Sequence, residues 1–257
     1  MSNFIYIAGP CVLESEVLAV SIAETLKNYV RSQPIDFVFK ASYDKANRTT
    51  LGAYRGPGID AGLEMLRSVR KAAGVRVLTD VHDVHDVARV AETVDVIQIP
   101  AFLSRQTDLL VEAARTGRTV NVKKAQFMAP DDMKYVVDKL VSAGANDIWL
   151  TERGVTFGYN TLVVDFRSFN VLRQFGFPVI FDATHSVQIP SKGGVSSGNR
   201  EYVLPLARAA AAFGIDGLFT EVYPEPDDAK CDGPNSIRLD AVPELLRQVL
   251  AARDVVK

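Results

Sequence analysis

Short apolar segments alternate with amphipathic segments along this chain, and that alternation restricts the possible folds more than any other feature. The apolar segments are rich in Val, Ile and Phe and show little polar alternation, which is typical of strands buried on both faces of a parallel sheet. We expect strands at Phe4–Ala8, Asp36–Lys40, Arg76–Thr79, Val94–Ile99, Thr119–Val122, Asp147–Thr151, Pro178–Asp182 and Gly217–Glu221.

Segments with the period of an amphipathic helix lie between these strands. Eight strand–helix repeats in 257 residues predict a single (β/α)8 barrel domain over residues 1–257, with a doubly wound open sheet as the alternative. Glycine follows several of the helical segments, as expected at helix C-termini. We expect helices at Glu16–Tyr29, Ala61–Ala73, Val84–Glu92, Thr107–Thr116, Asp131–Ala143, Asp165–Phe175, Tyr202–Phe213 and Ala241–Arg253.

Composition argues against several classes of protein. A net charge of −2 and an isoelectric point near 6.0 do not suit a nucleic-acid-binding surface. Two cysteines, Cys11 and Cys231, do not suggest a disulfide scaffold. The N-terminal segment lacks the basic region of a signal peptide, and no segment reaches the ~18 apolar residues of a membrane span. We therefore expect a cytoplasmic protein that binds neither nucleic acid nor membrane.

The segment from Phe39 to Thr50, FKASYDKANRTT, begins where the second predicted strand ends and concentrates positive charge. Lys40, Lys45 and Arg48 alternate there with amide and hydroxyl side chains, a combination that suits a ligand carrying both phosphate and carboxylate. Lysine and arginine in loops are usually solvated. Ligands of parallel α/β folds, however, bind at the carboxyl ends of strands, so we interpret this segment as an anion-binding loop.

Long connections follow three of the predicted strands, over residues 41–60, 183–200 and 222–240. Loops of this length in a compact domain are usually functional. The glycines at 193, 194 and 198 within the second connection suggest a mobile lid. All three connections leave the carboxyl end of a strand, which is the catalytic face of a barrel.

Every predicted strand also ends in polar or reactive residues, and two groups can be distinguished by chemistry. One group supplies positive charge for anions: Lys40, Lys45, Arg48, Lys123 and Arg153. The other group, Cys11, His185, Glu221 and Asp232, could bind a divalent metal such as zinc, iron(II) or manganese. From the residues alone Cys11 could equally be a small buried hydrophobe, and His185 a general base or a structural polar group.

Nine sequence strings, given below, closely resemble those of the 3-deoxy-D-manno-octulosonate 8-phosphate synthases, and the resemblance covers nearly the whole chain. The resemblance implies a barrel enzyme that condenses phosphoenolpyruvate with D-arabinose 5-phosphate and water, releasing phosphate, in lipopolysaccharide precursor synthesis. It also implies a homotetramer. It rests on IAGPC at 7–11, FKASYDKANRTT at 39–50, YRGPG at 54–58, LTDVHD at 78–83, QIPAFLSRQTDLL at 98–110, NVKKAQFMAP at 121–130, LTERGVTFGYNTLVVD at 150–165, FDATHSVQ at 181–188 and KCDGPN at 230–235.

The resemblance assigns substrate roles to individual residues. Lys123 and Arg153 are expected to bind the phosphate of phosphoenolpyruvate, with Lys40 and Lys45 facing its carboxylate and the reacting carbons. The sugar phosphate is expected to contact Asn47, Arg48 and Thr49, and Arg105 of a neighbouring subunit. The pocket is expected to be lined further by Asp80, His82, Phe102 and Gln188, and the residues closest to catalysis to be Lys45, Asp80, His185 and Asp232.

The family that this chain resembles has two branches. One is metal-dependent and has Cys at the position of Cys11, and the other is metal-free and has Asn there. Cys11 therefore implies a divalent metal bound with His185, Glu221 and Asp232. The string CDGPN at 231–235 is closer to the metal-free branch, so a metal that assists without being essential is the alternative.

Three other functions remain open at this point. A sister synthase would use erythrose 4-phosphate in place of the five-carbon sugar. A Schiff-base aldolase on the same barrel would use Lys123 as nucleophile. A protein that binds sugar phosphates without catalysis is the third, and the presence of Cys11, His185, Glu221 and Asp232 argues against it.

Overall fold

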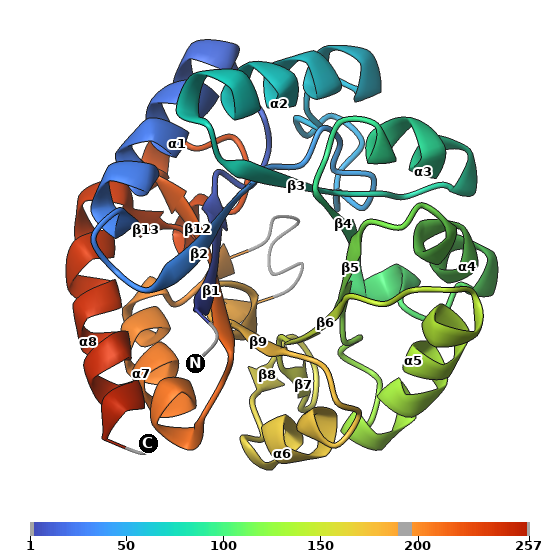
Figure 1. Cartoon of the computed structure of the whole chain (residues 1–257). Helices are drawn as coiled ribbons and strands as arrows, with labels where there is room; N and C mark the ends of the chain where they lie inside the picture. The colour runs from blue at the N-terminus through green and yellow to red at the C-terminus, as the bar shows by residue number, and fades with distance from the viewer. Residues whose placement is uncertain (1–2, 190–196, 256–257) are drawn as a thin grey trace.

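The computed structural model describes residues 3–189 and 197–255 and contains a closed barrel of eight parallel strands. Each strand pairs with the next, and β1 also pairs with β12, with Gly9 in register with Glu221. This closing pair confirms the predicted barrel and excludes the open sheet (Figure 1). The barrel strands are β1 (Phe4–Gly9), β2 (Ile35–Lys40), β3 (Arg76–Asp80), β4 (Val96–Ile99), β5 (Thr119–Lys123), β6 (Ile148–Glu152), β9 (Val179–Asp182) and β12 (Gly217–Tyr223).

Helices surround the barrel, one after each strand in the order predicted (Figure 1). Five helices are followed by a glycine with positive φ, at Gly74, Gly117, Gly144, Gly176 and Gly214, which confirms the predicted stop signals. The predicted helix at Asp131–Ala143 begins as a short 3-10 turn at Pro130–Asp132. The helices are α1 (Glu16–Val30), α2 (Ile59–Ala73), α3 (Val84–Ala91), α4 (Thr107–Arg115), α5 (Met133–Ser142), α6 (Arg167–Arg173), α7 (Val203–Phe213) and α8 (Val242–Asp254).

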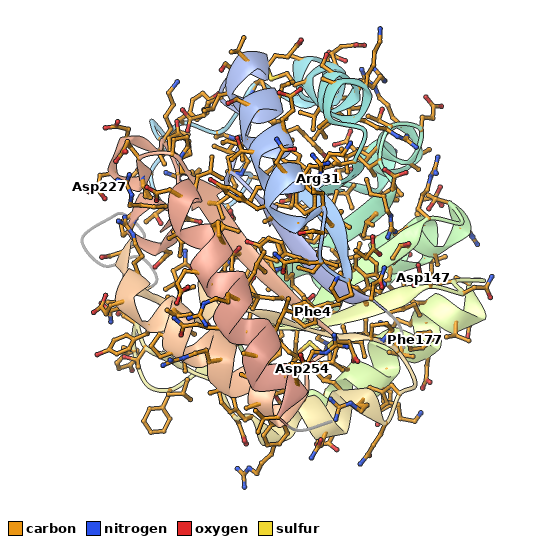
Figure 2. The ribbon with its side chains drawn as sticks, turned by 60° about the vertical axis from the view of Figure 1, so that its left-hand side comes forward. Phe4, Arg31, Asp147, Phe177, Asp227 and Asp254 are labelled. Atoms are coloured by element: carbon orange, nitrogen blue, oxygen red, sulfur yellow. The ribbon has the colours of Figure 1, made fainter. Side chains whose placement is uncertain are left out.

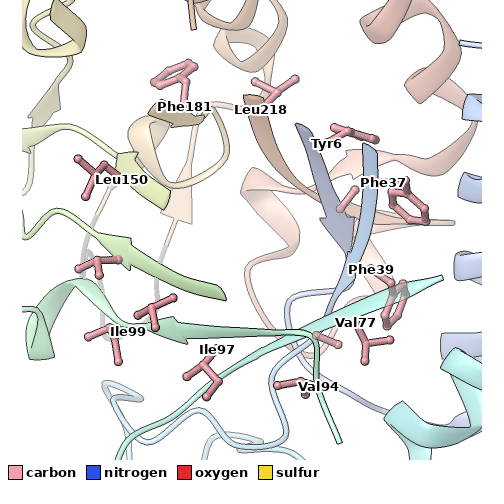
Figure 3. Close-up of a cluster of buried hydrophobic side chains, with 14 of the residues drawn as sticks. Tyr6, Phe37, Phe39, Val77, Val94, Ile97, Ile99, Leu150, Phe181 and Leu218 are labelled. Atoms are coloured by element: carbon pink, nitrogen blue, oxygen red, sulfur yellow. The ribbon is translucent and has the colours of Figure 1, made fainter. Parts of the chain in front are cut away.

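Side chains of each strand alternate between two apolar layers because successive residues point to opposite faces. In β1, Tyr6 joins the layer between strands and helices, whereas Ile5 and Ile7 join the barrel interior. Figure 3 shows part of the outer layer, including Tyr6, Phe39 and Leu218. The interior layer is smaller and consists of Ile5, Ile7, Val38, Leu78, Val96, Trp149, Ile180 and Phe219.

The same alternation places the functional side chains. Val38 lies in the barrel interior, so Lys40, two residues later, lies on the same face at the carboxyl end. Asp182 follows Ile180 and Glu221 follows Phe219 in the same way. Apolar residues fill the lower interior, and the residues that continue the inward face at the carboxyl ends are Gly9, Cys11, Lys40, Asp80, Gln98, Lys123, Arg153, Asp182 and Glu221.

The connections at the carboxyl end contain small sheets that were not predicted. A hairpin, β7 (Val155–Thr156) with β8 (Leu162–Val163), follows β6. A second antiparallel pair, β10 (Gln188–Ile189) with β11 (Ser197–Gly198), follows β9, and β13 (Ile237–Arg238) extends β12. The predicted lid lies mostly in residues 190–196, outside the described residues.

Figure 2 shows the barrel from the side, with α8 crossing its outer surface. Asp227, in the loop after β12, lies at the opposite end from Phe4, where β1 begins. Within the described residues, no helix is both long and apolar enough to cross a membrane.

Candidate active site

A cavity of about 390 Å³ opens at the carboxyl end of the barrel strands. Its walls include most of the residues that the sequence predicts to bind substrate, to act in catalysis or to hold a metal. These are Lys40, Lys45, Asn47, Arg48, Thr49, Asp80, His82, Phe102, Lys123, Arg153, His185, Gln188 and Asp232. Arg105 is exposed and does not line the cavity in the described chain, and Cys11 and Glu221 are buried beside it.

Asp182 connects the cationic side chains of the site with the proposed metal ligands. The sequence assigned Asp182 no role. Its Oδ2 atom accepts a hydrogen bond from Lys123 Nζ at 2.6 Å and lies 2.9 Å from His185 Nδ1. Burial would raise the pKa of Asp182, but the charges of His185 and Lys123 outweigh it and hold that pKa well below its usual range. The position of Asp182 two residues after inward-facing Ile180 was the signal that could have identified it.

Lys123 and Arg153 form a cationic wall. Burial lowers the pKa of Lys123 to about 8, although Asp182 opposes the shift. Arg153 donates to Gln188 Oε1 at 3.1 Å, while its Nη1 atom is buried without a hydrogen-bond partner among the described residues. A buried guanidinium with an unused donor is poised to bind an anion.

Lys40 and Asp80 belong to a buried polar network under the anion-binding loop. Lys40 Nζ donates to Ser42 Oγ at 3.0 Å, and Ser42 Oγ donates to Asp80 Oδ1 at 2.5 Å. His82 Nε2 lies 2.9 Å from Asp80 Oδ2. Burial would raise the pKa of Asp80, but the hydrogen bond with His82 and the nearby lysine charges hold it well below its ordinary value. Asp80 is therefore ionised and fixed in position at neutral pH.

The four predicted metal ligands converge from the segments that follow β1 and β9, from β12 and from the loop after β12. His185 Nε2 lies 3.5 Å from Glu221 Oε1 and 3.7 Å from Asp232 Oδ2, and Cys11 Sγ lies 3.4 Å from Asp232 Oδ2. Burial would lower the pKa of His185, but Asp182 and Glu221 raise it to about 9. A cluster with this much negative charge around one imidazole suits a cation.

Glu221 supports this fit most directly. Its side chain is fully buried, yet neither carboxylate oxygen has a hydrogen-bond partner within residues 3–189 and 197–255. Lys40 Nζ and Lys45 Nζ approach Oε1 only to 3.6 and 3.9 Å. An unsatisfied buried carboxylate is costly, and coordination of a metal would satisfy it. The sulfur, imidazole and carboxylate donors together fit zinc, iron(II) or manganese.

Arg48 lines the cavity and also contacts a cysteine in the cavity wall. Its Nη1 atom donates to Cys231 Sγ at 2.8 Å, next to the proposed metal ligand Asp232. The Nε atom of Arg48 is buried without a hydrogen-bond partner in the described residues. Arg48 and Cys231 thus both lie in the cavity wall, and the sequence had assigned Cys231 no role.

A second buried ion pair supports Arg153 from behind. Lys124 Nζ lies 3.5 Å from Glu152 Oε1, and both side chains are about 2% exposed. The same oxygen accepts hydrogen bonds from the backbone nitrogens of Arg153 and Gly154, at 2.9 and 2.7 Å. This pair fixes the backbone from which Arg153 enters the cavity.

Comparison with known proteins agrees with this geometry. The model of the DAHP synthetase I family matches residues 2–257. This chain belongs to the DAHP synthetase I family. It is 56% identical to a 2-dehydro-3-deoxyphosphooctonate aldolase of Geobacter metallireducens over 254 residues, which is 98% of this chain and 93% of that protein.

Two further relatives with the same name come from other bacteria. The Pelobacter propionicus protein is 58% identical over 252 residues, covering 98% of this chain and 93% of its own length. The Desulfatibacillum aliphaticivorans protein is 54% identical over 248 residues, covering 96% and 91%. The predicted resemblance to the octulosonate 8-phosphate synthases is therefore confirmed for this member of the DAHP synthetase I family.

Proposed function

We propose that this protein condenses phosphoenolpyruvate with D-arabinose 5-phosphate and water, giving 3-deoxy-D-manno-octulosonate 8-phosphate and inorganic phosphate for lipopolysaccharide synthesis. The observation that carries this proposal is that two separate sets of cationic side chains line one cavity. Lys123 ends β5 and Arg153 directly follows β6, whereas Lys45 and Arg48 lie in the loop after β2. Two phosphorylated substrates need two such anchors.

Each substrate then has a defined place. The unused Arg153 donor and Lys123 suit the phosphate of phosphoenolpyruvate, with Lys40 near its carboxylate. The sugar phosphate suits the other end of the cavity, lined by Asn47, Arg48 and Thr49. This arrangement brings the third carbon of phosphoenolpyruvate to the sugar aldehyde, so that the reaction is accelerated by positioning.

The bond changes require charge control at two carbons. The third carbon of phosphoenolpyruvate bonds to the aldehyde carbon, and the aldehyde oxygen gains a proton. Water adds to the second carbon and loses one proton, which leaves a hydroxyl there. As the bond from that carbon to the phosphate oxygen breaks, the hydroxyl loses its remaining proton and becomes the keto group, and phosphate is released. Lys45 is placed to stabilise the developing alkoxide, and the ionised carboxylates of Asp80 and Asp232 are placed to accept the proton of water. His185, whose pKa is raised to about 9, is protonated at neutral pH without a metal and acts there as a proton donor.

A divalent metal belongs to this proposal through the residues that would hold it. Cys11, His185, Glu221 and Asp232 provide the donors. When bound, such an ion supplies Lewis-acid polarisation of an oxygen and increased acidity of a water. Asp182 holds the His185 imidazole by its other nitrogen, which orients Nε2 toward Glu221 and Asp232.

The test is release of phosphate from phosphoenolpyruvate with three partners: D-arabinose 5-phosphate, erythrose 4-phosphate and no sugar. We expect release only with D-arabinose 5-phosphate. Release with erythrose 4-phosphate would instead establish the sister synthase, and no release with either sugar would favour the binding protein. Chelation followed by addition of zinc, iron(II) or manganese then tells whether the metal is essential and which ion restores activity.

The lowered pKa of Lys123 is the one observation that favours the Schiff-base aldolase. Borohydride trapping with D-arabinose 5-phosphate or pyruvate distinguishes the two mechanisms. We expect no covalent label, because Lys123 Nζ is bound to Asp182 at 2.6 Å and is assigned to phosphate. Labelling that disappears in Lys123→Arg would replace our mechanism. A homotetramer with Arg105 acting across subunits, and a cytoplasmic location, stay predictions.

A further inference from the structure

Cys231 lies next to the proposed metal centre but outside the donor set that the family resemblance implies. Its Sγ atom lies 2.8 Å from Cys11 Sγ. Cys11, Cys231 and Asp232 offer ligand atoms that all lie within 4.8 Å of one another. These residues come from two distant segments, so the barrel closure at β1 and β12 is what brings the two sulfurs together.

The surroundings of Cys231 are not those of a cysteine that only fills an apolar space. Arg48 Nη1 donates a hydrogen bond to its sulfur at 2.8 Å. The apolar cluster around it is small, with Cys11, Val12 and partly buried Tyr54. A cysteine that serves as a small hydrophobe does not need a charged donor on its sulfur.

A second observation points independently to a ligand at this place. Both carboxylate oxygens of Glu221 are buried without a hydrogen-bond partner in the described residues. Glu221 Oε1 lies 3.5 Å from Nε2 of His185, another residue of the same centre. The centre therefore contains a donor set that is incomplete without a cation, and two sulfurs border it.

We propose that Cys231 is a second sulfur ligand of this centre, used when the ion is thiophilic. Zinc or cadmium would be held by the two sulfurs of Cys11 and Cys231 together with Asp232 and Glu221, whereas manganese would use the nitrogen and oxygen donors of His185, Glu221 and Asp232. Thiolates select zinc over manganese, so Cys231 sets which metal the protein prefers. The inference rests on the metal centre of the proposed function.

The distances are compatible with this role. Two sulfurs bound at about 2.3 Å to one tetrahedral zinc lie roughly 3.8 Å apart. The two sulfurs are 2.8 Å apart in the structure, so they must separate by about 1 Å, a displacement that a small side-chain rotation provides. Each thiol loses a proton when it binds the ion, so binding releases protons.

The experiment uses the whole protein, stripped of metal by a chelator under reducing, oxygen-free conditions and titrated with cadmium. The ultraviolet sulfur-to-cadmium charge-transfer band measures the number of thiolates per bound ion. Because Cys11 and Cys231 are the two cysteines of the chain, each Cys→Ser variant leaves a single thiol. We expect the band per bound cadmium to fall to about half in either variant and to vanish in the double variant. Zinc affinity should fall on the order of 10-fold to 100-fold in Cys231→Ser, with little change for manganese.

A wild-type measurement protects the test against a variant that misfolds. Zinc X-ray absorption on the unaltered protein counts sulfur neighbours at about 2.3 Å, and two such neighbours support the proposal. One sulfur neighbour, with an unchanged cadmium band in Cys231→Ser, would overturn it and leave the proposed metal centre intact. Failure of the protein to bind cadmium or zinc at all would overturn both, while phosphate release by the metal-free protein reports separately on the proposed reaction.

Discussion

At the scale of the residue, Asp182 joins the cationic and the metal-binding parts of the site, although the sequence assigned it no role. One carboxylate oxygen contacts Lys123 Nζ at 2.6 Å and His185 Nδ1 at 2.9 Å. It therefore orients a proposed phosphate ligand and a proposed metal ligand together. A hydrogen bond to the second nitrogen of a metal-binding histidine fixes both its tautomer and its ring orientation.

We expect Asp182→Asn to lower kcat/KM for phosphoenolpyruvate by about 10-fold to 100-fold, the range found for such supporting carboxylates. The amide cannot pair with the charge of Lys123, and it holds the imidazole less firmly. Steady-state kinetics and metal affinity of the same variant measure the effect. Asp165→Asn, which removes an exposed carboxylate paired with Arg167, serves as the control and should leave both values unchanged. Equal effects in the two variants would contradict the role of Asp182.

The pKa of Lys123 predicts a pH dependence of substrate capture. Burial lowers it to about 8, so the charged form that binds phosphate is lost as the pH rises through that value. We expect kcat/KM for phosphoenolpyruvate, which reports the free enzyme, to decline above about pH 8. In Lys123→Arg the guanidinium stays protonated, so the decline should weaken even if the overall rate is lower. The same alkaline profile in both proteins would assign the titration to another group.

At the scale of the element, the ends of β5 and β6 are tied together by charge. Lys124 and Glu152 follow outward-facing Val122 and Leu150, so they lie behind the strands rather than in the cavity. Glu152 Oε1 also accepts hydrogen bonds from two backbone nitrogens at 2.9 and 2.7 Å. The pair thus determines how the chain turns after β6 and where Arg153 points.

We expect Lys124→Met to destabilise the protein by roughly 3–5 kcal/mol, because it leaves a buried carboxylate without its partner. Glu152→Gln in the same chain removes that charge and keeps an acceptor for the backbone nitrogens, so the double variant should recover most of the loss. Urea unfolding measures both. A double variant as unstable as Lys124→Met would show that packing of the lysine stem, rather than its charge, matters.

At the scale of the whole molecule, the proposed metal centre lies where the barrel closes. Its donors lie in or directly after β1, β9 and β12, so an ion there connects the first strand of the barrel to the last two. Strands far apart in sequence pay a loop-closure entropy to meet, and a bound ion stabilises the closed state by mass action.

We therefore expect chelation to lower the melting temperature. An ion present at about 1,000 times its dissociation constant stabilises a protein by ~4 kcal/mol. For a chain of this size that corresponds to roughly 8–16 °C. Calorimetry with and without chelator measures the shift, and Glu221→Gln, which keeps the shape of the side chain, should abolish it. A shift retained in Glu221→Gln would place the bound ion elsewhere.

The sequence by itself determined the barrel, its strand order and the identity of most of the cavity wall. This was possible because apolar periodicity, glycine stop signals and polar strand ends are local properties, and because the resemblance covered nearly the whole chain. Side-chain alternation along β2, β9 and β12 even specifies which residues face the cavity, once the strands are assigned.

The tertiary structure alone decided which of these side chains touch. The contacts of Asp182 with Lys123 and of Cys11 with Cys231 join residues 59 and 220 positions apart. No spacing in the chain encodes them, because they depend on strand register and on closure of β1 against β12. The buried Lys124–Glu152 pair and the contact of Arg48 with Cys231 were missed for the same reason.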